Sequence, residues 1–445
     1  MLRSRFFAIF SVAVIMVTAL CIGVKPVQAK DYWPTAGNVS SKCATVIDAE
    51  TGTVLYEKNT TKEKYPASIT KIMTAMLAIE KGNLDDTITF SEKAVYDTEG
   101  SSILRDVGEQ LSLRDCLYAL MLESANDCAY AIAEYIAGDI DSFAKMMNEK
   151  AKELGCKNTH FVNPHGLPDD DHYTCARDMA LIAKEAYKNE TFRTICGTKE
   201  YILPKTNKHD KLVMHNHHQM LYPLKTTQYL YDNCVGGKTG YTTVANNTLV
   251  TYATKDDMTL ICVVMDCITP AHYIDTKELL DFCFDNYQMV KVSDLTASKK
   301  SASTGDITTA DDYLSIDKDA KVIIPKTAKI SEITSKTDTD NTSGDSVGTI
   351  NYYYGEHEVG SADIVTNKVK VDTYEFDNES DTATEVKKGD VKKIVIPIII
   401  IAAIVVVIII ISRFIMRYKK KTELIIKDNY RKKNKRRRKK GPNYL

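Results

Sequence analysis

The sequence predicts a mixed α+β domain, in which helices pack on one sheet, followed by a small all-β domain and a C-terminal transmembrane helix. Three observations support this prediction. Strand-like segments open and close residues 30–290, with helical segments between them. Short strand-like segments separated by turn residues occupy residues 310–372. Finally, Ile394 to Ile411 is an apolar stretch interrupted only by Pro397.

The α+β domain is expected to open with a hairpin, Cys43–Ile47 and Thr53–Tyr56, around a turn at residues 48–52. An apolar helical run follows Pro66 and stops at Gly82, because Pro favours helix starts and Gly favours helix ends. Further segments follow in order. Helices are expected at residues 112–123, 126–136, 177–187 and 275–287, and strands at Asn247–Ala253 and Thr259–Met265.

The second domain is predicted from composition and alternation. A connector rich in Ser, Thr, Lys and Ala spans residues 291–309, and a charged stalk spans residues 373–393. Between them lie the strand candidates Tyr313–Ile316, Lys321–Ile324, Thr349–Tyr354 and Ile364–Val371.

The first 29 residues have the pattern of a secretory signal peptide. Arg3 and Arg5 precede an apolar run, and Val27-Gln28-Ala29 fits a cleavage site after Ala29. Lipoprotein processing at Cys21 is a weaker interpretation, because Thr18 stands where a lipobox would favour Leu.

Residues 394–416 are predicted to cross the membrane, because the apolar stretch matches a hydrocarbon core of about 30 Å. The tail, residues 417–445, has fourteen Lys and Arg and two acidic residues. The positive-inside rule therefore predicts a single-pass protein of the cell membrane, with a cytoplasmic tail and an extracytoplasmic α+β domain. We expect the basic tail to contact anionic membrane lipid rather than nucleic acid, the alternative partner for such a run.

The net charge of −1 conceals two strongly charged parts, since residues 30–393 carry about −17 without the basic tail. Ten cysteines remain after Cys21, mostly in apolar runs that are typical of buried core residues. No spacing resembles a zinc site and no glycine loop resembles a phosphate cradle, so neither a metal nor a cofactor is predicted.

Three motifs in a fixed order indicate serine acyl-transfer chemistry: Ser68-Ile69-Thr70-Lys71, Ser124-Ala125-Asn126 and Lys238-Thr239-Gly240. Ser68 is expected in the first turn of a helix, with Lys71 one turn further on the same face. S-x-x-K alone is weak evidence, because Ser142 to Lys145 and Ser315 to Lys318 also fit it. Only the first match opens a predicted apolar helix and is followed by the other two motifs.

Residues 31–290 resemble the serine D-alanyl-D-alanine carboxypeptidases, the low-molecular-mass penicillin-binding proteins, and residues 310–372 resemble that family's C-terminal β domain. Beyond the three motifs, the resemblance rests on Asn158 to Leu167, His172-Tyr173, Ala176 to Ala180, Glu99 to Ser102 and Met121 to Asp127. It implies a penicillin-binding, serine β-lactamase-like fold and removal of the terminal D-alanine from peptidoglycan stem peptides. It also implies that β-lactams acylate the enzyme.

The resemblance assigns a role to each motif residue. Ser68 would be the acyl-ester nucleophile, Lys71 its general base and Ser124 a proton relay. Asn126, Lys238, Thr239 and Gly240 would bind substrate, and the backbone N–H groups of Ser68 and Tyr241 would form the oxyanion hole. Burial and the proximity of Lys238 would keep Lys71 neutral. We expect His165 and His172 to support a turn-rich loop rather than to catalyse.

The sequence departs from the family at two places. No Arg lies between Arg193 and Arg413, whereas many relatives have one after the last catalytic strand, where this chain has Asp266 to His272. Asn246 also replaces the usual Gly. Two alternatives therefore stand beside the carboxypeptidase: a non-catalytic wall-binding or scaffold homologue, and a β-lactamase. For the second, the chain lacks the Glu-x-x-Leu-Asn of class A enzymes.

Overall fold

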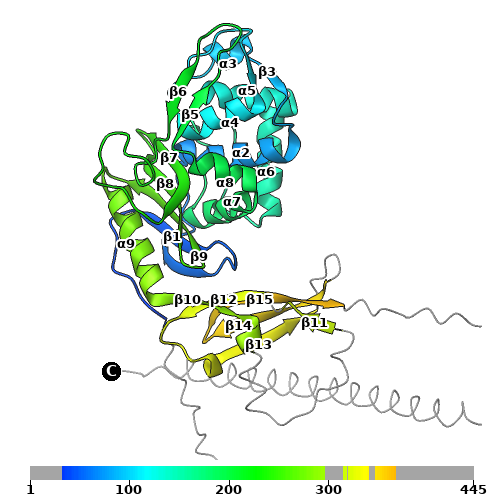
Figure 1. The fold of residues 1–445 in the computed structure, drawn as a ribbon, viewed down its shortest axis with the longest axis vertical. Helices are drawn as coiled ribbons and strands as arrows, with labels where there is room; N and C mark the ends of the chain where they lie inside the picture. The colour runs from blue at the N-terminus through cyan, green and yellow to red at the C-terminus, as the bar shows by residue number, and fades with distance from the viewer. Residues whose placement is uncertain (1–32, 296–313, 318, 340–345, 367–445) are drawn as a thin grey trace, which may run out of the picture. The chain divides into compact units, whose positions relative to one another are not determined.

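The computed structural model describes residues 33–295, 314–317, 319–339 and 346–366. Its centre is an antiparallel five-stranded sheet in the order β2-β1-β9-β8-β7 (Figure 1). The strands are β1 (Cys43–Asp48), β2 (Val54–Lys58), β7 (Cys234–Thr242), β8 (Asn246–Lys255) and β9 (Met258–Cys267). The β7 strand, with the third motif, thus forms one edge of the sheet.

Alternation along the strands gives the sheet two apolar faces. Val250, Ile261 and Val263 join one core, which packs against helices α2 and α4 to α8. Leu249, Leu260 and Val264 join the other, which packs against α9. The helices are α2 (Lys71–Lys81), α4 (Leu113–Leu122), α5 (Asn126–Ala137), α6 (Ile140–Glu153), α7 (Ala176–Lys188), α8 (Glu190–Gly197) and α9 (Ala271–Asn286).

The predicted hairpin, central strands and principal helices are confirmed within a few residues. One predicted helix differs at its start. A 3-10 turn, η1 (Ala67–Thr70), carries Ser68, and the α-helix begins only at Lys71. Ser112 accepts a hydrogen bond from the Asp115 N–H and caps α4, as its sequence suggested.

Shorter elements escaped the sequence analysis. They are helix α3 (Glu92–Tyr96) and the hairpin-like pairs β3 (Thr87–Thr89) with β4 (Gln110–Ser112) and β5 (Glu200–Leu203) with β6 (Leu212–His215). Helices α6 and α8 were also not predicted. Strands of three or four residues give too few alternations for a periodic signal.

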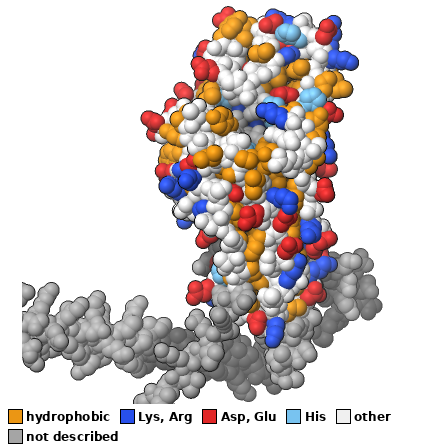
Figure 2. All heavy atoms as spheres, turned by 90° about the vertical axis from the view of Figure 1, so that its left-hand side faces the viewer, with side chains coloured by type: hydrophobic (Ala, Val, Ile, Leu, Met, Phe, Trp, Pro, Cys, Tyr) orange, Lys and Arg blue, Asp and Glu red, His pale blue; other side chains and the backbone are white. Residues whose placement is uncertain are grey.

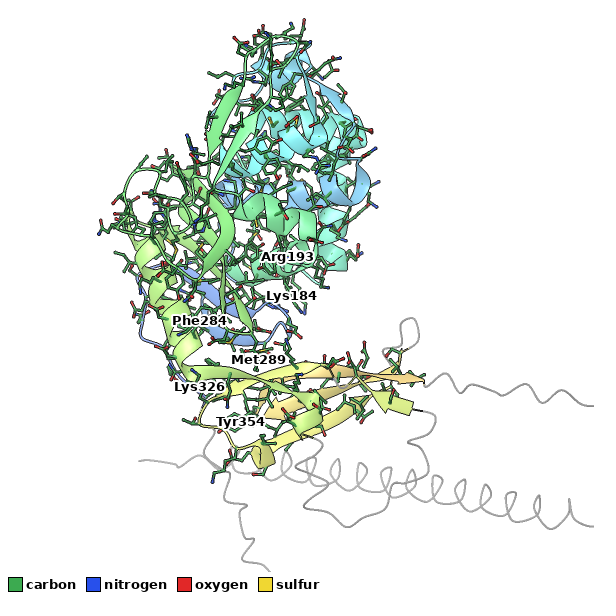
Figure 3. All side chains as sticks on the ribbon, in the orientation of Figure 1. Lys184, Arg193, Phe284, Met289, Lys326 and Tyr354 are labelled. Atoms are coloured by element: carbon green, nitrogen blue, oxygen red, sulfur yellow. The ribbon has the colours of Figure 1, made fainter. Side chains whose placement is uncertain are left out.

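The segment after α9 differs from the prediction. We expected a helix to Tyr287 and then a connector, but β10 (Tyr287–Lys291) pairs with β12 (Lys321–Pro325). Val292 and Leu295 enter the apolar core of the small domain. The Lys326 ammonium donates to the Phe284 carbonyl at 2.9 Å, and both residues and Met289 of β10 are labelled in Figure 3. The first residues after the helix therefore form structure instead of a linker.

A four-stranded sheet in the order β11-β15-β14-β13 completes the small domain. Its strands are β11 (Leu314–Ile316), β13 (Ile333–Asp338), β14 (Ser346–Tyr354) and β15 (His357–Thr366), and η2 (Ile330–Glu332) precedes β13. The strand β13 was not predicted. The last strand begins at His357 rather than at Ile364, because its polar first half hides it from a hydrophobicity argument.

All ten cysteines of the described residues are free, and nine are buried. The predicted signal peptide, most of the connector, the stalk, the transmembrane segment and the basic tail lie outside the described residues. Among the residues that are described, no helix has the length and apolar character needed to span a bilayer. On the face shown in Figure 2, acidic, basic and apolar side chains are interspersed, so this face has no broad basic surface.

Candidate active site

Ser68 and Lys71 meet where η1 continues into α2. The Lys71 ammonium nitrogen lies 3.0 Å from Ser68 Oγ. The lysine is fully buried, whereas Ser68 is only half-buried. A nucleophile open to substrate is therefore in contact with an amine shielded from water.

The loop containing His165 supports this pair. The Lys71 ammonium donates to the His165 carbonyl at 2.8 Å, and the Thr74 hydroxyl donates to the Pro164 carbonyl at 2.6 Å. Gly166 approaches so closely that a Cβ there would lie 1.9 Å from the Ala67 carbonyl oxygen. Ala67 itself has a φ of 52°. The strained backbone before Ser68 thus depends on a glycine across from it.

The second motif lies between α4 and α5. Ser124 adopts a φ of 62°, and Asn126 is the first residue of α5. The Asn126 side-chain oxygen accepts from the Lys71 ammonium at 2.6 Å, and its amide nitrogen donates to the Glu99 carbonyl. Asn126 therefore fixes the lysine as well as the wall of the site.

The third motif places Lys238 opposite Ser124. Its ammonium lies 3.0 Å from Ser124 Oγ and 2.9 Å from the Thr239 carbonyl. Only 1% of Lys238 is exposed. Behind Ser124, the Glu123 carboxylate accepts from the His217 ring at 3.0 Å and from the His215 N–H at 2.7 Å. The segment that precedes β7 is thereby tied to the second motif.

Both lysines are poised to lose their protons. Burial lowers the pKa of Lys71 well below its usual range, and the neighbouring Lys238 charge lowers it further, while Asp127 acts in the opposite direction. Burial also lowers the pKa of Lys238 to about 7. A neutral Lys71 amine can accept the Ser68 proton, which a surface lysine could not do at neutral pH.

Gly240 brings the edge strand against the nucleophile. A Cβ on this glycine would lie 2.8 Å from the Ser68 backbone nitrogen and 3.2 Å from Ala67 Cβ. Thr239 is half-buried beside it, and the Tyr241 side chain is 64% exposed. The two backbone segments proposed for the oxyanion hole are therefore adjacent.

The structure accounts for one of the two departures from the family pattern. Asn246 has a φ of 56°, a conformation that Gly favours but Asn tolerates, and its side-chain amide donates to Asp266 at 2.8 Å. Asp266 also pairs with Lys64 at 2.5 Å. Ile268, in the segment where many relatives have Arg, is 74% exposed. An apolar side chain therefore stands in the segment that carries the cation in those relatives.

His172 has a structural environment. Its Nδ1 accepts from the Val162 N–H at 3.1 Å, so its Nε2 donates to the Thr70 hydroxyl at 3.0 Å. Burial lowers its pKa to about 4, and that of His165 to about 3. Both rings are therefore neutral supports near the site. Within the described residues, no group of three or more His, Cys, Asp or Glu could hold a metal ion.

Comparison with protein families matches residues 29–269 to the family described as D-alanyl-D-alanine carboxypeptidase. The chain belongs to this family. It is 40% identical over 255 residues to D-alanyl-D-alanine carboxypeptidase DacF of Bacillus subtilis, an alignment that covers 56% of this chain and 63% of the relative. It is 31% identical over 337 residues to DacA of Escherichia coli, covering 70% and 79%. The match thus spans just under two thirds of the Bacillus relative's length.

Solved structures show the same fold. Penicillin-binding protein 5 of Haemophilus influenzae aligns with a TM-score of 0.59 at 26% identity, covering 75% of this chain and 98% of that one. A serine-to-alanine mutant of the Streptomyces K15 DD-transpeptidase aligns with a TM-score of 0.52 at 31% identity, covering 56% and 99%. The α+β, penicillin-binding-protein fold expected from the sequence is confirmed.

The site contains contacts that the sequence analysis missed. The motifs identified Ser68, Lys71, Ser124, Asn126 and Lys238, and the structure brings all five together. The His165 carbonyl, the Glu99 carbonyl and Glu123 were not anticipated. A backbone carbonyl leaves no residue-type signal, and the one feature of the sequence that could have indicated it is Gly166 beside His165, which permits a close approach.

Proposed function

We propose that the protein is a membrane-anchored serine D-Ala-D-Ala carboxypeptidase that trims the terminal D-alanine from peptidoglycan stem peptides. The observation that supports this most directly is the 3.0 Å approach of a fully buried Lys71 to Ser68. Such a lysine can be neutral at rest and can act as the base for acyl transfer. The family of the chain supplies the substrate class.

In the first step, Lys71 takes the Ser68 proton as the hydroxyl oxygen attacks the penultimate D-alanine carbonyl. The developing oxyanion is stabilised by the Ser68 and Tyr241 N–H groups, donors of a kind that lower a barrier by about 3–4 kcal/mol. Lys238 and Thr239 hold the terminal carboxylate, which supplies the charge complementarity that the missing Arg provides in relatives.

In the second step, the leaving D-alanine amine must gain a proton. Ser124 Oγ, 3.0 Å from Lys238, relays to this amine the proton that Lys71 took from Ser68, so Lys71 is neutral again when the D-alanine leaves. The Asn126 side-chain oxygen holds Lys71. One N–H of its amide group donates to the Glu99 carbonyl, and the other can donate a hydrogen bond to the substrate. Water then attacks the ester at Ser68, with Lys71 again as the base, and releases the shortened peptide.

The same nucleophile would be acylated by β-lactams. We also propose that the C-terminal segment anchors the protein in the cell membrane and that the catalytic domain is extracytoplasmic, on the sequence evidence of residues 1–29 and 394–445. No cofactor is needed for this chemistry.

D-Alanine release from Nα,Nε-diacetyl-L-Lys-D-Ala-D-Ala tests the proposed activity. The wild-type protein should release one D-alanine per peptide, and Ser68→Ala should release none. A wild-type protein that binds the peptide without cleaving it would instead support the scaffold alternative. Rapid turnover of benzylpenicillin without peptide cleavage would support the β-lactamase.

A further inference from the structure

A cavity beside Tyr65, close to the nucleophile in the chain, has no role in the steps above. It has a volume of about 320 Å³, and we call it the Tyr65 pocket. Its lining residues are Glu63, Lys64, Tyr65, Asp170, Tyr173, Val244, Ala245 and Asp266. The lining combines two aromatic rings, an exposed valine and three carboxylates.

Two of the segments that line the Tyr65 pocket also build the active site. Tyr65 precedes Ser68 by three residues, and Val244 follows Tyr241 by three. The Thr248 hydroxyl donates to the Pro66 carbonyl at 2.7 Å and thereby joins β8 to the segment before Ser68. A peptide that extends from the nucleophile along the edge strand would therefore run toward this pocket.

The direction of the bound peptide follows from the proposed roles along β7. Thr239 holds the terminal carboxylate, and the Tyr241 N–H faces the carbonyl under attack. The acyl part of the peptide must then continue past Tyr241 toward Val244. One extended residue spans about 3.5 Å, so the residue before the D-alanine pair lies one step further along the edge strand, in the direction of the pocket.

The pocket lining has more negative than positive side chains, since three carboxylates face one lysine. Lys64 and Asp266 pair with each other at 2.5 Å. Asp170 accepts from the Tyr65 hydroxyl at 3.1 Å, and Glu63 accepts from the Asn158 side chain at 3.2 Å. Both of these acceptors are exposed carboxylates bonded to neutral donors, so their negative charge remains available to a cationic ligand.

The walls suit an aliphatic chain that ends in an ammonium group. Tyr65, Tyr173 and Val244 offer apolar and aromatic surface for methylene groups, and tyrosine faces also attract a cation. Asp170 and Glu63 provide the counter-charge at the end of such a chain. An acidic side chain would meet repulsion in the same place.

We propose that the Tyr65 pocket binds the side-chain ammonium of the diamino residue that precedes D-Ala-D-Ala, with Asp170 and Glu63 as specificity-determining residues. This inference rests on the proposed carboxypeptidase function and extends it to the choice of stem peptide. The pocket would favour a free amine over an amine already used in a cross-link or otherwise acylated.

The test compares D-alanine release from two peptides by the full-length protein at low ionic strength. One is Nα-acetyl-L-Lys-D-Ala-D-Ala, with a free ammonium, and the other is Nα,Nε-diacetyl-L-Lys-D-Ala-D-Ala. We expect kcat/KM to be up to about fivefold higher for the free amine, which is the upper end of what an exposed ion pair contributes. The preference should shrink as salt is added.

Asp170→Asn and Glu63→Gln should each lower this ratio toward one, through a higher KM for the free-amine peptide. Asp171→Asn is the matched control, because it removes one charge from the same exposed loop at a residue outside the pocket lining. It should keep the wild-type ratio.

Equal rates for both peptides in the wild type would overturn the subsite and leave the carboxypeptidase intact. An equal loss of preference in Asp171→Asn would also overturn the subsite. The preference would then come from the overall negative charge of the loop and not from the carboxylates of the pocket. No release from either peptide would overturn the proposed function and the subsite with it.

Discussion

Lys71 donates to the side-chain oxygen of Asn126 at 2.6 Å, which is shorter than the 3.0 Å that separates it from Ser68 Oγ. The base of the site is thus held by the second motif before any substrate arrives. Together with the His165 carbonyl, Asn126 fixes the lysine while burial lowers its pKa. Hydrogen bonds to Asn126 and His165 therefore set the position of the Lys71 amine, whereas burial and the Lys238 charge set its protonation state.

Lys71→Met should abolish D-alanine release, by about a thousandfold or more, because the serine loses its base. The melting temperature should change by only a few degrees, because the removal of a buried amine offsets the loss of its hydrogen bonds to Asn126 and His165. Peptide hydrolysis and thermal unfolding of the same preparation measure both effects. A large fall in melting temperature would make the lysine a structural residue.

Lys238→Ala should move the acidic limb of the acylation rate to higher pH. The positive charge of Lys238 helps to lower the pKa of Lys71, so its removal lets Lys71 hold its proton to a higher pH. The rate of benzylpenicillin acylation against pH measures this shift. Lys238→Arg keeps the positive charge and should leave the acidic limb of the pH–rate profile where it is in the wild type. Identical pH–rate profiles for Lys238→Ala and the wild type would show that the Lys238 charge does not lower the pKa of Lys71.

Gly166→Ala should destabilise the protein by about 3 kcal/mol or more and slow acylation, because a Cβ at this position would strike the Ala67 carbonyl. Gly138→Ala is its control, since Gly138 has the same φ of 87° and no atom within 4 Å of a Cβ. It should cost only about 1 kcal/mol. Urea unfolding compares the two, and equal costs would show that the close approach is unimportant.

Deletion of residues 394–445 should release an active protein into the medium, because we assign membrane attachment to this segment. Fractionation of cells and medium, followed by the peptide assay, measures the change. If the shortened protein stays with membranes after a salt wash, the anchor lies elsewhere.

The sequence predicted the site better than it predicted the small domain. Ser68, Lys71 and Lys238 belong to motifs whose spacing reflects helix and strand geometry, and that information is local. The pairing of β10 with β12 is not local, because Tyr287 and Pro325 are joined across a segment with no continuous pattern. The first half of β15 was missed for a different reason, because most of its residues are polar and give no hydrophobic pattern.

Contacts made by the backbone also escaped prediction. The His165 and Glu99 carbonyls accept hydrogen bonds from Lys71 and Asn126, and any residue type could supply such an oxygen. What the sequence shows instead is the small residue that permits the approach. Gly166 and Gly240 are such residues in this site.

The most direct test of an acyl-enzyme at Ser68 is the intact mass of the full-length protein during incubation with benzylpenicillin, with Ser68→Ala as the control. We predict a gain of one drug molecule that persists for many minutes in the wild type and is absent from Ser68→Ala. An unmodified wild-type protein with intact drug, or an adduct that survives in Ser68→Ala, would contradict the proposed chemistry.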